Sequence, residues 1–458
     1  MKNKLLKNVL SYSFGNLISK ALLFLFGIVV ARSYGPVIYG QYNYAVSIVS
    51  YFIMFASLGV QSYAVYLIAK EPKRTSELYS KVLSLEVFFG ILATIMLVIF
   101  IRIVPSNAPM VFVVGSTIVI SALNVDWLYK AKQNFKFVSI QVVANALIQL
   151  IIVAIAIICN VTNWIVLPIA VSIAQFISNC YLMYKVKTIY SIKYYLDLKD
   201  WTPLIRNGLP FLFSGIFAGI NCNIDIVLLG NMVNDKLVGC YSAAYKIINL
   251  LTLMVSVVFT PIFPVLVEKF ENNLVIDINK LVSKSIKILC IIILPIIIGG
   301  IITGERIIVF LFGREYSGTG VVFIILLVYT AIFYIREIYG YLISASGNQK
   351  KYMLITCVSA GSNICMNLLL IPIWGIEGAA VATVISELIN LVLMKINTEK
   401  IITLKFENLQ FFRIVFAVIV MGGITFILQT LGINIIIIIM VSGGVYALTL
   451  FVERIKIK

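Results

Sequence analysis

The chain contains no histidine. Histidine is the commonest metal ligand and the usual proton carrier near neutral pH, so its absence weighs against metal-dependent and histidine-based catalysis. The seven cysteines form no Cys-x-x-Cys pair, and most of them lie inside apolar runs. Neither a metal site nor a disulfide framework is therefore indicated, and no cofactor is expected.

Charge is also scarce. Only 12% of the 458 residues are charged and 61% are hydrophobic, whereas about a quarter of the residues of a soluble protein are charged. This excess of apolar surface predicts that the surrounding solvent is lipid. A net charge of +17 in a soluble protein would suggest nucleic acid. Here the lysines and arginines lie in short loops, which is typical of membrane orientation, so no nucleic-acid partner is expected.

Apolar stretches long enough to cross a bilayer recur along the whole chain. A helix needs about 20 apolar residues to span the hydrocarbon, and windows of this size predict fourteen transmembrane helices. The first apolar run is longer than the core of a signal peptide, so we expect it to be retained. The predicted spans are 12–31, 42–69, 82–104, 109–129, 138–159, 164–184, 207–230, 239–267, 281–303, 320–345, 352–371, 377–396, 411–430 and 433–452.

The basic residues alternate along the predicted loops. With a cytoplasmic N-terminus, most lie in inside loops, and an error in the number of helices would disrupt this alternation. The sequence therefore predicts an even number of spans and two cytoplasmic termini in a bacterial inner membrane. The outside loops hold only Arg32, Arg102, Lys236, Arg306 and Arg314.

The second half of the chain repeats features of the first. Residues 39–46 resemble 238–245 at equivalent places, and residues 173–178 resemble 385–390. Such repeats are typical of secondary transporters, in which the substrate path lies between the halves. We expect an all-α membrane protein made of two six-helix bundles related by pseudo-two-fold symmetry, with an appended hairpin. The predicted boundaries are 1–188, 205–397 and 411–454.

Eight ionisable side chains fall inside the predicted spans. Such a side chain at bilayer depth costs at least about 2.5–3.5 kcal/mol and often marks a pathway. Alternatives remain for some of them: a loop lysine could satisfy Glu86 or Asp126, and Asp225 could be a packing partner of Lys246 or Lys20. Arg336 and Glu337 are adjacent in the sequence and point about 100° apart on a helix, so they need not pair. The full set is Lys20, Glu86, Asp126, Asp225, Lys246, Arg336, Glu337 and Glu387.

Polar residues also follow one face of several spans at helical spacing. A helix facing lipid has no reason to keep such a stripe, so we expect these faces to line a hydrated cavity between the two bundles. The stripes contain Asn16 with Lys20, Gln141 with Asn145 and Gln149, Asn221 with Asp225, Lys246 with Asn249, and Thr383 with Glu387 and Asn390.

Several short segments together resemble a known family. In order and spacing they are similar to the Wzx-type O-antigen and capsule polysaccharide flippases of the multidrug/oligosaccharidyl-lipid/polysaccharide exporter superfamily. The resemblance covers about the first twelve spans. Its segments are 31–36, 39–42, 224–230, 238–246, 311–316, 367–372 and 375–380.

This resemblance implies a V-shaped pair of six-helix bundles with alternating access to a central cavity. Family members move an undecaprenyl-pyrophosphate-linked oligosaccharide from the inner to the outer leaflet, and glycan polymerase machinery is a plausible partner. An anionic headgroup needs a polar, partly cationic lumen, for which we expect Lys20, Lys246, Arg336, Asn16 and Asn221. The carboxylates expected to line the cavity or couple transport to a proton or sodium gradient are Asp225, Glu387, Glu337, Asp126 and Glu86.

Three other functions remain open. A lipid II flippase shares the anionic substrate, and the appended hairpin is also similar to that branch, in which it helps to form a lipid-binding groove. A multidrug extruder would favour acidic cavity residues, which the five carboxylates allow and the three basic residues oppose. A membrane enzyme such as a glycan polymerase usually needs a large outside loop, whereas the longest one here, about 304–319, is short. We therefore expect a transporter rather than an enzyme.

Overall fold

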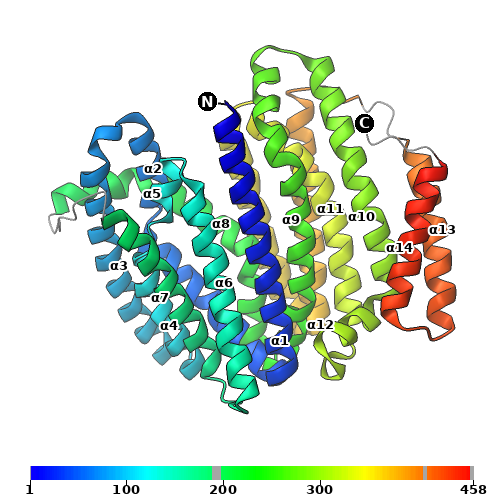
Figure 1. Cartoon of the computed structure of the whole chain (residues 1–458), viewed down its shortest axis with the longest axis horizontal. Coiled ribbons are helices and arrows are strands. Elements are labelled where there is room, and N and C mark those ends of the chain that lie inside the picture. The colour runs from blue at the N-terminus through cyan, green and yellow to red at the C-terminus, as the bar shows by residue number, and fades with distance from the viewer. Residues whose placement is uncertain (1, 188–197, 406–409, 454–458) are drawn as a thin grey trace. The chain divides into compact units, whose positions relative to one another are not determined.

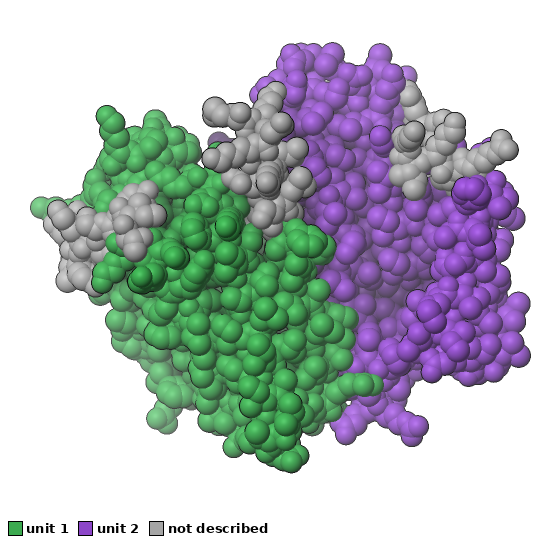
Figure 2. Space-filling view, in the orientation of Figure 1, with its two compact units in different colours: residues 1–239 green, residues 240–458 purple. Residues whose placement is uncertain are grey.

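The computed structural model describes residues 2–187, 198–405 and 410–453. Within these ranges every regular element is a helix (Figure 1), and many of the helices are long and apolar. The expected all-α membrane fold is thus confirmed. The chain divides into two compact units, residues 1–239 and 240–458 (Figure 2). The predicted bundle boundaries, 1–188, 205–397 and 411–454, stay predictions.

Unit 1 is built from helices of very different length. It contains α1 (Lys2–Ser57), α2 (Val60–Lys70), the 3-10 helix η1 (Pro72–Arg74), α3 (Thr75–Ile103), α4 (Ala108–Ala122), α5 (Asp126–Ala131), α6 (Phe135–Ile158), α7 (Val166–Lys187) and α8 (Leu198–Met232).

Unit 2 begins inside a helix. It contains most of α9 (Asp235–Glu271), then α10 (Val275–Phe312), the 3-10 helix η2 (Arg314–Tyr316), α11 (Gly320–Ala345), α12 (Gln349–Glu399), α13 (Phe411–Thr430) and α14 (Ile435–Val452). The last two helices form the expected hairpin and pack on α10, where the Tyr446 hydroxyl donates to the Ile291 carbonyl at 2.8 Å.

Two of the helices are helical hairpins. Gly35 in α1 (φ 75°) and Gly375 in α12 (φ 56°) break the helical backbone in the region that favours glycine. In α12 the Ser359 hydroxyl donates to the Ser386 carbonyl at 3.3 Å, although a straight helix would hold residues this far apart in sequence about 40 Å apart. Likewise Phe26 and Tyr42 of α1 are in ring contact. Each helix therefore turns back on itself.

These hairpins bear on the number of spans. Among the described residues, twelve helices are long and apolar enough to cross a membrane. The two hairpin helices contribute spans of 44 and 51 residues, each about twice the length that one crossing requires. Counting their arms separately gives fourteen segments, but the exact number of crossings stays a prediction.

Two glycines of the repeated motif lie against one another in unit 1. A Cβ on Gly40 would meet the Asp235 carbonyl oxygen at 2.0 Å and the Gly239 nitrogen at 2.8 Å, and one on Gly239 would meet the Pro36 carbonyl oxygen at 1.9 Å. Small residues at helix contacts let backbones approach closely in membrane proteins. Since the blocking atoms belong to the backbone, no side-chain movement could make room.

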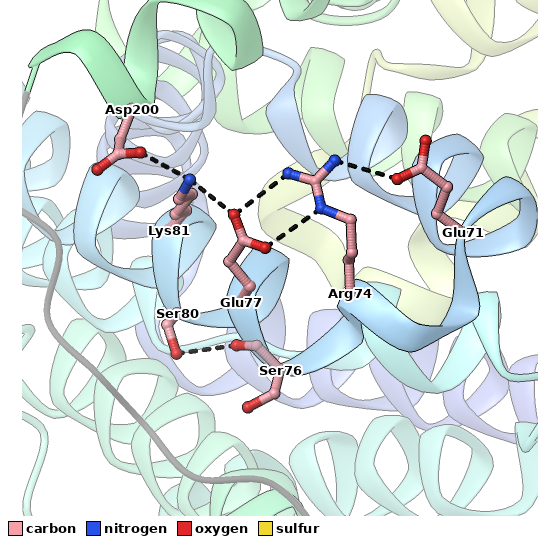
Figure 3. Close-up of polar contacts among 7 residues, drawn as sticks. All are labelled: Glu71, Arg74, Ser76, Glu77, Ser80, Lys81 and Asp200. Atoms are coloured by element: carbon pink, nitrogen blue, oxygen red, sulfur yellow. Dashed lines mark hydrogen bonds and ion pairs between the residues drawn. The ribbon is translucent and has the colours of Figure 1, made fainter.

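A chain of ion pairs joins the start of α8 to α3 (Figure 3). The Lys81 ammonium contacts Glu77 at 2.8 Å and Asp200 at 2.6 Å, and Arg74 pairs with both Glu77 and Glu71. Only 14% of the Lys81 side chain is exposed, so this lysine links two helices rather than extending into solvent. The buried ring of Trp201, directly after Asp200, anchors the same end of α8.

The glycine contact gives a first prediction. We expect Gly239→Ala to destabilise the protein by about 1–3 kcal/mol, the typical cost of overpacking, and to lower its thermal unfolding midpoint in detergent. Gly215→Ala in α8 is the matched control, because a Cβ there would meet nothing within 4 Å. Equal midpoints for the two variants would contradict the close approach.

Candidate functional site

The most concentrated charge in unit 2 surrounds Arg336 of α11. Its Nε donates to Glu387 Oε1 of α12 at 2.7 Å, and its Nη1 donates to Glu337 Oε1 at 2.5 Å. The guanidinium also lies 4.7 Å from the centre of the Phe333 ring, a distance typical of a cation–π contact. Arg336 and Glu387 are 7% and 6% exposed, so the pair is sheltered within the unit.

The sequence left open whether Arg336 and Glu337 pair. Arg336 and Glu337 diverge on the helix surface, yet the structure pairs them. The arginine side chain is long, and its forked donors can bind two carboxylates in different directions. One donor therefore reaches Glu387 on the neighbouring helix, while another turns back to Glu337.

The cluster has more negative than positive groups. One guanidinium serves two carboxylates, and the Tyr352 side chain also interacts with Arg336 and with both glutamates. Tyr352 was not expected from the sequence, because only the packing of α12 on α11 brings it there. The charge of Arg336 is balanced inside unit 2, where the guanidinium holds two helices together.

The polar stripe on α6 packs inside unit 1, which corrects the expectation that it lines a cavity. Gln141 and Gln149 are buried. Gln141 Nε2 donates to Asn179 Oδ1 of α7 at 3.1 Å, and Asn145 Nδ2 contacts Ser178 Oγ at 3.4 Å. Gln149 donates to Asn145. Side-chain hydrogen bonds of this kind join helices in membranes.

The stripe on the second arm of α12 is buried in the same way. Thr383, Glu387 and Asn390 are between 2% and 6% exposed, and the expectation that they line a cavity between the two bundles stays a prediction. Next to them, Asn363 of the first arm donates to Ser386 Oγ at 3.1 Å. Polar contacts therefore join the two arms beside Thr383, Glu387 and Asn390.

The predicted anion-binding residues are divided between the units. Unit 1 holds Asn16, Lys20 and Asn221, and unit 2 holds Lys246 and Arg336. Lys20 is exposed, and Asn16 is half-buried one turn before it on α1. Lys246 is half-buried, as is Asn221, whose amide donates to the Phe217 carbonyl at 3.2 Å. Lys20 and Lys246 are the more accessible cations of this set.

The remaining carboxylates have different surroundings. Asp225 is 1% exposed on α8 and interacts electrostatically with Tyr51 of α1. Asp126 begins α5 and pairs with Lys130 at 2.7 Å. Glu86 of α3 is 2% exposed and accepts a hydrogen bond from Gln61. Neither Tyr51 nor Gln61 could be identified from the sequence, since both contacts depend on how the helices pack.

The Arg336 cluster gives a second prediction. Arg336→Ala would leave the buried Glu387 and the half-buried Glu337 without their cation, and removing one partner of a buried pair typically costs about 3–5 kcal/mol. We expect a large fall in the unfolding midpoint in detergent. The triple variant Arg336→Leu, Glu337→Gln, Glu387→Gln should recover much of that loss, because it removes the unbalanced charges as well. A midpoint unchanged in Arg336→Ala would contradict the structural role.

Named relatives share moderate sequence identity with this chain. The chain is 27% identical over 212 residues to the probable low-salt glycan biosynthesis flippase Agl15 of Haloferax volcanii, a match over 46% of this chain and 45% of that protein. It is 24% identical over 395 residues to the capsular polysaccharide biosynthesis protein CapF of Staphylococcus aureus, a match over 82% of this chain and 95% of that protein. The Agl15 match thus spans less than half of that protein.

A solved structure has the same fold. Lipid II flippase MurJ in an inward closed conformation superposes with a TM-score of 0.79 at 15% identity, over 97% of this chain and 98% of that one. At this identity the likeness concerns the fold. It agrees with an all-helical membrane protein, and the names of the relatives and of this neighbour are those of transporters and biosynthesis proteins rather than enzymes.

The chain also matches a known protein family over a long continuous stretch. Residues 5–270, more than half of the chain, match the family described as polysaccharide biosynthesis protein. This match covers nearly all of unit 1 and extends to the end of α9. The resemblance expected from the short sequence segments is confirmed: the chain belongs to the polysaccharide biosynthesis protein family.

Proposed function

We propose that this protein is a membrane flippase that moves a lipid-linked glycan during polysaccharide biosynthesis. The observation that carries the proposal is the family match over residues 5–270. The name of Agl15, a probable flippase of glycan biosynthesis, supports the same activity, and the name of CapF supports a surface polysaccharide such as a capsule as the product.

The finer proposal concerns the substrate. We infer that it is an undecaprenyl-pyrophosphate-linked oligosaccharide, carried from the inner to the outer leaflet by alternating access. A pyrophosphate headgroup is anionic, and cationic side chains within a membrane protein can bind it through charge-assisted hydrogen bonds. Lys20 and Lys246 are the accessible cations proposed for this role, with Asn16 and Asn221 as neutral partners. The carboxylates of the predicted set stay candidates for ion coupling.

The role proposed for Arg336 follows from its contacts. Because two carboxylates already balance its charge, it suits the positioning of α11 and α12 better than direct binding of an anion. The location in a bacterial inner membrane, the two cytoplasmic termini and an association with glycan polymerase machinery belong to this proposal too.

Lipid II is the alternative substrate that a specific observation favours. The fold superposes on MurJ over nearly the whole of both chains, and the hairpin α13–α14 lies within that match. Both substrates present an anionic pyrophosphate, so charge does not separate them. We favour the oligosaccharide because the family match and the CapF name both refer to polysaccharide.

Gene deletion distinguishes these functions. We expect loss of a surface polysaccharide, with its lipid-linked precursor accumulating on the cytoplasmic side, measured by lipid extraction and glycan analysis. An intact surface with a defect in cell-wall synthesis would favour lipid II. An intact surface with altered sensitivity to cationic drugs would instead favour a multidrug extruder.

The cation proposal gives a separate prediction. In the deletion strain, Lys20→Ala and Lys246→Ala should each lower surface glycan by about tenfold or more, the effect of losing roughly 1.4 kcal/mol of charge-assisted binding. Protein level in the membrane, measured by immunoblot, should stay unchanged. Lys350→Ala is the control, since Lys350 is exposed at the start of α12. Normal export by both variants would contradict the role of these lysines.

A further inference from the structure

A small cavity lies inside unit 1 where α1 ends. Its volume is about 190 Å³, many times the roughly 10–15 Å³ that one water molecule needs. Its polar lining comes from Ser57 of α1, Gln61 of α2, Glu86 of α3, and Ser121 and Asn124 at the end of α4. Side chains from four helices thus meet around a space large enough for a small ligand.

Glu86 is the one ionisable group in this lining. It is 2% exposed, and Gln61 Nε2 donates to its Oε2 at 3.1 Å, while its Oε1 has no hydrogen-bond partner. No cationic side chain pairs with it among the residues that the structure describes. The charged neighbour that acts on it is Asp126, of the same sign, and Lys130 is paired with Asp126. A buried carboxylate without a positive partner is strongly unfavourable.

The two hydroxyl groups of the lining already donate elsewhere. The Ser57 hydroxyl donates to the Met54 carbonyl at 2.9 Å, and the Ser121 hydroxyl donates to the Ile118 carbonyl at 2.6 Å. Each hydroxyl oxygen therefore has lone pairs left and no hydrogen to give. Asn124 Oδ1 accepts from the Asp126 backbone N–H at 3.1 Å and has a second lone pair. With the Glu86 carboxylate and two hydroxyl oxygens, the lining is richer in acceptors than in donors, which suits a cation better than an anion.

A break between two helices adds to the negative potential. Leu58 (φ 46°) and Gly59 (φ 68°) separate α1 from α2, and the last turn of α1, including Met54 and Ser57, forms one wall of the cavity. The final carbonyls of a helix have no partner within it and carry a partial negative charge. The ends of discontinuous membrane helices can coordinate sodium ions or protons in this way.

We propose that this cavity binds one sodium ion. The Glu86 carboxylate supplies the single negative charge that matches a monovalent ion, and the oxygens of Ser57, Ser121 and Asn124 supply neutral hard ligands of the kind that such cations prefer. The site lies in unit 1, whereas Arg336, Glu337 and Glu387 lie in unit 2. It goes beyond the proposed transport of a glycan and does not depend on it, because binding can be measured without the glycan.

The test is sodium binding to the purified full-length protein in detergent or lipid nanodiscs. The unfolding midpoint should rise saturably with NaCl when choline chloride keeps the ionic strength constant, and radioactive sodium should bind at one site per chain. Glu86→Gln should abolish both effects. Glu399→Gln, which removes an exposed carboxylate at the end of α12 in unit 2, should leave sodium affinity within about twofold.

A second variant keeps the proposal testable if Glu86→Gln fails to fold. Ser121→Ala removes one ligand oxygen and leaves the carboxylate, and it should weaken sodium affinity by about tenfold, as the loss of one supporting group commonly does at metal sites. Sodium binding that persists at full affinity in both variants overturns the proposal. So does a wild-type protein that shows no saturable response to sodium, since Glu86 would then be held neutral by a proton.

Discussion

Polar groups inside a membrane must find partners within the protein, because lipid offers none. In both units, side chains of neighbouring helices supply such partners for several buried polar groups. In unit 1 the amides of α6 bond with α7, and in unit 2 Asn363 bonds with Ser386 across the hairpin of α12. In the cluster around Arg336 the partners are charged, since each ion has a partner of opposite sign. Glu86 is the member of the predicted set that departs from this pattern, which is why its surroundings point to a ligand.

The helical fold was predictable because it depends on composition and length. Runs of about 20 apolar residues can only be helices in lipid, and their order in the sequence agrees with the helices of the structure. The positions of the two turns were also indicated, because the predicted spans separate near Gly35 and Gly375, where the backbone turns.

The surroundings of the candidate site were harder to predict. Helical spacing shows which residues share a face, but it does not show which face meets a neighbouring helix. The polar stripe of α6 therefore suggested a cavity, although it packs on α7. Partners such as Gln61 and Tyr352 come from other helices and have no signal in the sequence near Glu86 or Arg336. The pairing of Arg336 with Glu337 escaped prediction because side-chain reach matters there more than direction.

The hairpin at Gly375 has a consequence for biosynthesis. Its two arms are held together by Ser359, Asn363 and Ser386, and the turn between them centres on one glycine. The first arm is synthesised before the second, so Ser359 and Asn363 have no partner on the second arm until Ser386 has been added. The polar contacts of the first arm are therefore completed only when the second arm lies beside it.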